Sequence, residues 1–359
     1  MIDANRSNGP ESYRLVRLSA PTSFERGVEY GAQAREEIAA CLDMYRAHLC
    51  VMKGVDWQAA REEAQRYLPL VSAALPVETE MLRGVAEGSG VSFEDIMVLN
   101  VRYEILHYPK EECTTYAVLR SAARGGKVFI GQNWDQRPLV MSHAIVLHIT
   151  MEDGTKIMGV TEAGQLLRNG FTSHGLGLVS NGLNSSADSR RIGVPGNFMR
   201  MRALRSRDFG EMREVATAFC RAVANNYILA SAREDLAVDV EGLPEMPVVL
   251  QPENGIITHA NHILSHPEMD TSKGKRIRGE RLNKLLQEHV GDITADYIRK
   301  CLSDHEGYPD SVCSHAEEDK RDVHHRWMTV ASIVYDLDEG IASICKGNPC
   351  RGTFKEYLL

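Results

Sequence analysis

The repeat of apolar residues changes abruptly at Cys113. Before this residue, apolar side chains recur every three or four positions, as in residues 25–53 and 57–75, which is typical of amphipathic helices. After it, short runs rich in β-branched and aromatic residues are separated by Gly-Gly and Asp-Gly turns, which indicates β-hairpins. We therefore expect a mainly helical segment, residues 1–112, followed by a sheet-rich segment, residues 113–359, within one folded domain.

The expected elements alternate between helices and strands along the whole chain. After a short strand before residue 21, helices are expected over 25–53, 57–75 and 92–99, with Pro76 ending the second of them. Strands are expected over 114–119, 127–130, 144–151, 156–160, 175–179, 227–230, 236–240, 248–250, 256–259, 330–335 and 341–345, and further helices over 198–224, 275–288 and 294–302. Because hairpin connections outnumber parallel crossovers, the sequence predicts an α+β fold of antiparallel sheets layered with helices.

Charge and composition narrow the class of partner. The chain of 359 residues has a net charge of −8 and no strongly basic segment, which argues against nucleic acid or an anionic membrane as the main partner. Its start lacks the basic flank and apolar core of a secretory signal, so a cytoplasmic location is expected. The eight cysteines show no paired framework and are expected to be free thiols. A small molecule is therefore a more expected partner than nucleic acid or a membrane.

Cys113 stands directly before a predicted strand, where the helical and sheet-rich segments meet. A cysteine in such a place is more often a small buried hydrophobic residue than a nucleophile. Two other residues favour the nucleophile. Asp135 ends the second strand of the same hairpin and Asn261 follows a later strand, so a carboxylate and an amide could lie beside the thiol. Either of them could equally be an ordinary turn residue.

Several short motifs carry a resemblance to a known family. They are Cys113-Thr114-Thr115, Gly131-Gln132-Asn133-Trp134-Asp135, Glu162-Ala163-Gly164 with Asn169-Gly170, Asn181-Gly182-Leu183-Asn184 and His259-Ala260-Asn261-His262, together with residues 84–88, 99–104 and 347–350. In this order and spacing they resemble the isopenicillin N acyltransferase family (acyl-coenzyme A:6-aminopenicillanic acid acyltransferase-like proteins) of the N-terminal nucleophile hydrolases. The resemblance covers most of the chain.

The resemblance implies a fold and a maturation step. The fold would be a four-layer αββα sandwich, with two antiparallel sheets between helical layers. The precursor would cut itself between Glu112 and Cys113, giving an α fragment of 112 residues and a β fragment of 247 residues (359 minus 112). Cys113 would then carry a free α-amine beside its thiol, so that base and nucleophile belong to one residue.

The resemblance also implies roles for further residues. Asp135 would orient the new ammonium group or balance its charge, and Asn261 would stabilise the tetrahedral oxyanion. Thr115 would help to position the thiol. The family uses an arginine from the C-terminal part of the chain, for which Arg326 is the candidate. No cofactor and no metal is expected.

One residue departs from the family pattern. Fungal members have glycine immediately before the nucleophile, whereas this chain has Glu112. A side chain there restricts the strained backbone that self-cleavage uses, and a carboxylate opposes the negative charge that develops on the scissile carbonyl. Slow processing is therefore expected.

The sequence thus predicts a self-processing cysteine amidohydrolase or acyltransferase. Cys113 would attack a small N-acyl amide or an acyl thioester, and the resulting thioester would pass its acyl group to water or an amine. One alternative is an amidase of the penicillin V acylase or bile salt hydrolase type, although those enzymes expose their cysteine after a very short leader. Another is an uncleaved, catalytically silent binding protein on the same fold. The expected partners are the small substrate and the two fragments of the chain, which bind each other. The sequence does not decide whether the protein forms a homo-oligomer.

Other clusters of chemically active residues receive a structural interpretation. A zinc site is not expected in either of two groups, because the first lies on a predicted strand before Pro267 and the second lacks C-x-x-C spacing. These groups are His259, His262 and His266, and Cys313, His315, His324 and His325. The densest basic run is expected to be a solvated helix face, with the phosphates of a coenzyme A donor as the alternative ligand. It comprises Lys273, Lys275, Arg276, Arg278 and Arg281.

Overall fold

The computed structural model describes residues 11–106, 113–189, 191–244, 246–272, 277–316 and 321–359. Its centre is a pair of β-sheets. The first has eight strands in the order β1 (Arg14–Leu18), β4 (Ala144–Thr150), β5 (Lys156–Glu162), β6 (Gly170–Thr172), β7 (Leu176–Gly182), β8 (Asn225–Ser231), β9 (Leu236–Gly242) and β10 (Pro247–Leu250). The second has six strands in the order β11 (Ile256–His259), β2 (Thr114–Val118), β3 (Phe129–Gln136), β12 (Met328–Asp336), β13 (Ile341–Lys346) and β14 (Phe354–Leu358).

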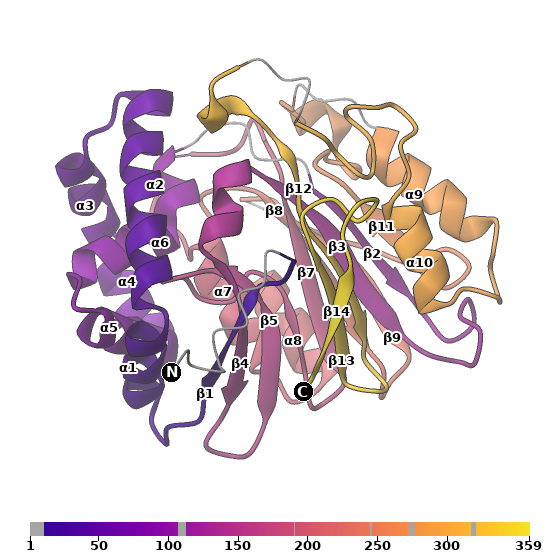
Figure 1. The fold of residues 1–359 in the computed structure, drawn as a ribbon, viewed down its shortest axis with the longest axis horizontal. Helices are drawn as coiled ribbons and strands as arrows, with labels where there is room; N and C mark the ends of the chain where they lie inside the picture. The colour runs from indigo at the N-terminus through magenta and orange to yellow at the C-terminus, as the bar shows by residue number, and fades with distance from the viewer. Residues whose placement is uncertain (1–10, 107–112, 190, 245, 273–276, 317–320) are drawn as a thin grey trace.

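The two sheets face each other and are covered by helices on their outer sides (Figure 1). Strands β2 and β3 contact β7 and β8 of the opposite sheet, and all residues of β2 and β3 are buried. Helices α7 (Gly196–Leu204) and α8 (Phe209–Ala218) cover the first sheet, while α9 (Ile277–Gln287) and α10 (Ala295–Leu302) cover the second. The protein therefore has the expected α+β fold, with antiparallel strand pairs everywhere except β1 with β4.

The N-terminal segment is helical apart from β1. Its helices are α1 (Ser23–Gln33), α2 (Arg35–Lys53), α3 (Trp57–Gln65), α4 (Leu68–Ala74), α5 (Pro76–Ser89) and α6 (Phe93–Leu106). They lie together beside the first sheet, where α5 and α6 contact α7 (Figure 1). Strand β1 runs parallel to β4 and pairs over its whole length, so the segment also contributes a strand to the first sheet.

Several boundaries differ from the sequence prediction for local reasons. Pro76 ends α4 as expected, but it also occupies the first turn of α5, where a proline loses no hydrogen bond. Gly84 lies within α5, where a Cβ would come 2.0 Å from the carbonyl oxygen of Phe24 in α1, so glycine allows the two helices to approach closely. The short strands β6 and β14 were not predicted. Both lack the long alternating pattern that distinguishes a strand from a turn.

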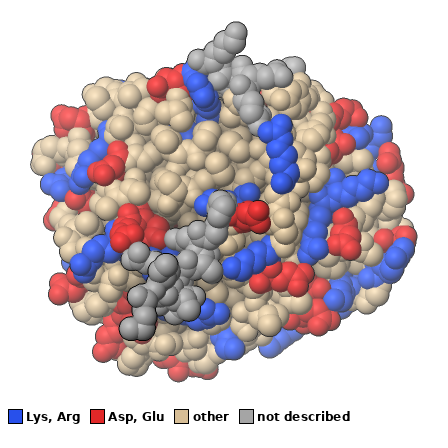
Figure 2. All heavy atoms as spheres, in the orientation of Figure 1, with Lys and Arg blue, Asp and Glu red and all other residues tan. Residues whose placement is uncertain are grey.

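Charged side chains of both signs are intermingled on the face shown in Figure 2. None of the helices among the described residues combines the length and the apolar character needed to cross a lipid bilayer.

Candidate active site

Strand register brings Asn261 beside Cys113. Strand β11 pairs with β2 so that His259 lies opposite Thr115, and the same antiparallel register continued by two residues places Asn261 opposite Cys113. The backbone N–H of Cys113 donates to Oδ1 of Asn261 over 2.5 Å, and Nδ2 of Asn261 donates to the carbonyl oxygen of Gly182 over 2.8 Å. Asn261 therefore joins the nucleophile's backbone to the end of β7 in the opposite sheet.

Asp135 lies on the outer side of the second sheet, toward α9. Thr329 pairs with it across β3 and β12 and donates a 2.7 Å hydrogen bond from Oγ1 to Oδ1 of Asp135. On its other oxygen, Asp135 forms a 3.3 Å ion pair with Nη1 of Arg278. Both side chains are almost completely buried, at 0% and 2% exposure. Asp135 and Cys113 are also in direct contact, since the thiol lies 3.8 Å from the Asp135 carbonyl oxygen.

Arg278 connects the carboxylate to the amide. Its Nη2 lies 3.5 Å from Oδ1 of Asn261, the same oxygen that accepts the bond from the Cys113 backbone. The prediction of a solvated basic face was wrong for this arginine, because α9 packs against β2 and β11 and turns Arg278 inward. Arg281, on the same helix, is partly exposed and pairs with Asp304 and Glu306. Lys273, Lys275 and Arg276 lie outside the described residues.

A second arginine approaches the thiol. Nη2 of Arg168 lies 3.9 Å from Sγ of Cys113, Nη1 donates to the hydroxyl of Tyr103 over 2.8 Å, and the guanidinium stacks 4.9 Å from the ring of Trp134. Arg168 is 5% exposed. Its positive charge therefore faces the sulfur inside the space between the two sheets. Sequence reasoning missed it, although Asn169 and Gly170 directly after it belonged to the quoted motifs.

Residues of the helical segment hold the loop that carries Arg168. The side chain of Asn100 donates to the Gly164 carbonyl over 3.0 Å and accepts from the Leu166 backbone over 2.9 Å. Tyr335 donates to Oδ1 of Asn169 over 2.6 Å. The motifs at residues 99–104, 162–164 and 169–170 thus meet in space and fix the loop between β5 and β6.

Thr115 and Arg326 lie differently from their predicted roles. The hydroxyl of Thr115 donates to the His259 carbonyl over 3.2 Å and accepts from Asn181 over 2.8 Å, so it ties three strands together and does not bond to the thiol. Arg326 is partly exposed and donates to the carbonyl oxygen of Arg321. Among the described residues it has no contact with Cys113 or Asp135, and Arg278 occupies the position beside the carboxylate. Glu112 lies outside the described residues.

A small cavity lies beside Arg168. Its volume is about 10 Å³, barely large enough for one water molecule, and it is lined by seven residues of α6, α7, the first sheet and the loop between β5 and β6. The residues are Tyr103, Arg168, Ser180, Asn181, Gly182, Arg200 and Asn225. Cys113 itself is completely buried.

His259, on β11, belongs to a buried charge cluster. Its Nε2 lies 2.9 Å from Glu241 and 3.8 Å from Asp239, two residues of β9. Burial disfavours the charged imidazole, but the two carboxylates outweigh burial and raise the pKa of His259 to about 9. Glu241 also accepts the backbone N–H groups of Leu264 and Ser265, which fixes the loop that carries Asn261.

This cluster predicts that stability falls in mild alkali. Because the folded-state pKa of His259 is raised to about 9, its contribution is complete below the unfolded value of about 6.5 and is lost as pH rises through 9. We expect the free energy of unfolding to fall by on the order of 3 kcal/mol between pH 7 and pH 10. Urea titrations at several pH values measure this slope. His259→Gln should flatten it, and an equal slope in both proteins would contradict the assignment.

The sequence is similar to that of one known protein family over most of its length. The sequence profile of the family described as acyl-coenzyme A:6-aminopenicillanic acid acyl-transferase matches residues 122–351. Among curated proteins, the chain is similar to the 40 kDa form of acyl-coenzyme A:6-aminopenicillanic-acid-acyltransferase from Emericella nidulans. The two are 28% identical over 341 residues, which cover 91% of each chain.

Solved structures show weaker likenesses. An N-acylethanolamine-hydrolyzing acid amidase orthologue from Caenorhabditis elegans is 15% identical, with a TM-score of 0.46 over 69% of this chain and 100% of that one. The R18L variant of a conjugated bile acid hydrolase from Clostridium perfringens is 12% identical, with a TM-score of 0.47 over 69% and 97%. Because the family profile spans well over half of the sequence, the chain belongs to the acyl-coenzyme A:6-aminopenicillanic acid acyl-transferase family.

Proposed function

We propose that this protein is a self-processing cysteine amidohydrolase or acyltransferase whose nucleophile is Cys113. The observation that carries the proposal is that the nitrogen and the sulfur of this residue each contact a different polar side chain. Its backbone nitrogen bonds to Asn261, and its sulfur lies beside the Arg168 guanidinium. Any buried backbone N–H needs an acceptor, but a cysteine that served only as a core hydrophobe would not need a buried positive charge beside its sulfur.

Processing would begin with the bond before Cys113. The thiol of Cys113 attacks the Glu112 carbonyl, its proton passes to the amide nitrogen as the C–N bond breaks, and the acyl group moves from nitrogen to sulfur. Water then hydrolyses the thioester, which releases the Glu112 carboxylate and regenerates the thiol. The product is a cysteine with a free α-amine in the place where the peptide nitrogen contacts Asn261.

The two arginines would prepare this residue for catalysis. Arg278 lies against the oxygen of Asn261 that contacts the Cys113 nitrogen, and a positive charge there disfavours a protonated amine. The amine then stays neutral and accepts the thiol proton. Arg168 stabilises the resulting thiolate across 3.9 Å. Asp135 stabilises the buried guanidinium of Arg278 and holds it beside Asn261.

The substrate would be a small N-acyl amide or an acyl thioester. Cys113 attacks its carbonyl, the α-amine returns the proton to the leaving amine or thiol, and an acyl thioester on Cys113 remains. Water or an amine completes the cycle. The name of the Emericella relative pairs an acyl thioester donor with an amine acceptor, which supports the transferase branch as the second half of the reaction.

Intact mass spectrometry of the denatured protein tests the proposal. We expect two species, the larger beginning at Cys113, and after mixing with an acyl substrate we expect the acyl mass on that species alone. A single 40.0 kDa chain that takes up no acyl group would refute the enzyme and favour a silent binding protein, which the closed surroundings of Cys113 also fit. Equal amounts of hydrolysis with and without added amine would exclude the transferase branch.

A further inference from the structure

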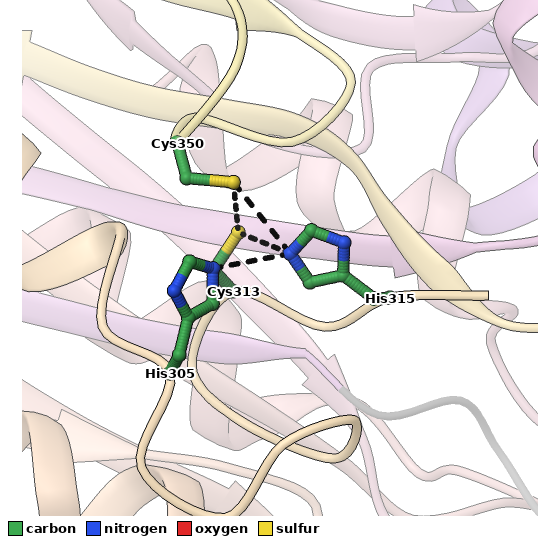
Figure 3. Close-up of side chains that lie close together, drawn as sticks. All are labelled: His305, Cys313, His315 and Cys350. Atoms are coloured by element: carbon green, nitrogen blue, oxygen red, sulfur yellow. Dashed lines mark hydrogen bonds between the residues drawn. The ribbon is translucent and has the colours of Figure 1, made fainter. Parts of the chain in front are cut away.

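Two cysteines and two histidines converge where the loop after α10 meets the turn between β13 and β14 (Figure 3). Cys313 and His315 lie in the loop after α10, His305 begins the same loop, and Cys350 lies in the turn between β13 and β14. One ligand atom from each residue falls within 4.8 Å of all the others. Sequence spacing had grouped Cys313 and His315 with His324 and His325. The structure replaces these last two by His305 and Cys350.

The separations fit a tetrahedron around one metal ion. Zinc bonds of about 2.3 Å to sulfur and about 2.0 Å to nitrogen require tetrahedral edges of about 3.8 Å between two sulfurs, about 3.5 Å between sulfur and nitrogen and about 3.3 Å between two nitrogens. The two sulfurs lie 3.6 Å apart. Nε2 of His315 lies 3.4 Å from Cys313, 3.6 Å from Cys350 and 3.1 Å from Nε2 of His305. Each of these four distances is within a few tenths of an ångström of the expected edge.

Ordinary hydrogen bonding does not account for this convergence. A neutral imidazole nitrogen offers either one hydrogen or one lone pair, yet Nε2 of His315 has three close neighbours. At most one of these contacts can be a normal hydrogen bond. A single cation that accepts a lone pair from all four atoms explains the three contacts together.

The surroundings suit thiolate ligands. Nδ2 of Asn348 donates to Sγ of Cys313 over 3.4 Å and to the Ser314 carbonyl over 2.6 Å, which fixes the ligand loop and the sulfur at once. Two thiolates balance the two charges of Zn²⁺, so the bound site is neutral and can be buried at Cys313 and His315. The other cluster of this kind, Cys41 with His143 and Glu162, is unsuitable because Arg102 already pairs with Glu162 over 2.8 Å.

We propose that His305, Cys313, His315 and Cys350 bind one structural Zn²⁺ ion. All four positions are filled by protein, which leaves no open position for a substrate and distinguishes this site from a catalytic metal. The ion would fasten the loop after α10 to the turn between β13 and β14.

The site would also brace the candidate active site. Ser314, between two ligands, exchanges hydrogen bonds of 3.0 Å with Thr329, whose hydroxyl donates to Asp135. Val312 accepts a 2.7 Å bond from the side chain of Asn133 on β3. Loss of the ion should therefore loosen the strand end that holds Asp135.

Metal analysis of the full-length protein, purified under reducing conditions without an affinity metal, tests the proposal. We expect about one zinc per chain, falling below about 0.1 in Cys313→Ser/Cys350→Ser. Cys50→Ser/Cys220→Ser, which alters two exposed cysteines elsewhere, should keep its zinc. A chelator should lower the melting temperature of the wild type but not that of the first double variant.

Cobalt substitution keeps the test independent of whether the variants fold. Co²⁺ added to the metal-free wild type should give the visible bands of a tetrahedral site and a thiolate-to-metal charge-transfer band. Absence of zinc together with failure of reduced protein to bind added Zn²⁺ or Co²⁺ overturns the proposal. So does an intact mass two hydrogens lighter with a Cys313–Cys350 disulfide, or zinc that remains in Cys313→Ser/Cys350→Ser.

Discussion

Cys113→Ala is expected to remain one chain of 40.0 kDa at every age of the preparation, while the wild type converts to two fragments. Without the sulfur there is no nucleophile for the acyl shift, and hydrolysis of acyl substrates should fall to the background rate. Because Cys113 is completely buried, the removal of one sulfur atom should cost only about 1 to 2 kcal/mol of stability. Denaturing electrophoresis over days and a thermal melt of the same sample measure the two effects.

Two sets of variants sharpen this result. Cys301→Ala removes another buried thiol and should process normally, so a loss of processing there would point to a general folding defect. Glu112→Gly should cleave itself severalfold faster than the wild type. Glu112→Gln should show how much of this increase in rate comes from removing the negative charge. Glu111→Gly, the control, should leave the rate of cleavage unchanged. Fragments in Cys113→Ala at the wild-type rate would show that another group, or a contaminating protease, cuts the chain.

Arg278→Met is expected to lose both stability and activity. Its guanidinium is the ion-pair partner of the buried Asp135 carboxylate, and removal of one member of such a pair typically costs about 3 to 5 kcal/mol. The same change removes the positive charge beside Asn261 that we propose keeps the Cys113 amine neutral. We therefore expect the pH optimum of hydrolysis to move to higher pH, in addition to a lower rate.

A double-mutant cycle separates the two effects. Asp135→Asn in the Arg278→Met background removes the uncompensated charge and should restore part of the free energy of unfolding, yet not the rate. Arg281→Met, three residues further along the same helix, deletes an ion pair near the surface and should cost about 1 kcal/mol or less. If Arg278→Met lowered the free energy of unfolding and the rate of hydrolysis no more than Arg281→Met does, Arg278 would have no role in the site.

The sequence was most informative where chemistry and local pattern coincide. The hairpin of β2 and β3 follows from two β-branched runs around Gly125-Gly126, and it places Asp135 beside Cys113. Asn261 could be placed because it follows a strand directly. In both cases one or two strand pairings decide the geometry, and strand pairing leaves a clear period in the sequence.

The arginines could not be found in this way. Arg278 sits in a run of basic residues that looks solvated, and only the packing of α9 on β2 and β11 decides that this one side chain turns inward. Arg168 lies in a loop without periodicity. The proposed zinc ligands are spread over residues 305–350, and only Cys313 and His315 are close in sequence. No local sequence motif therefore identifies them. Tertiary packing supplied the information that spacing lacked.

The pairing of β1 with β4 has a consequence for the cut protein. If the chain is severed before Cys113, the first piece still provides an edge strand to a sheet made by the second, and Tyr13 still donates to the carbonyl of Val330. The two fragments would therefore stay associated in one folded protein. They would elute together under native conditions and separate only on denaturation. The second piece expressed alone would leave the edge of β4 unpaired, so we expect joint production of the two pieces to give soluble material and production of the second piece alone to give aggregates.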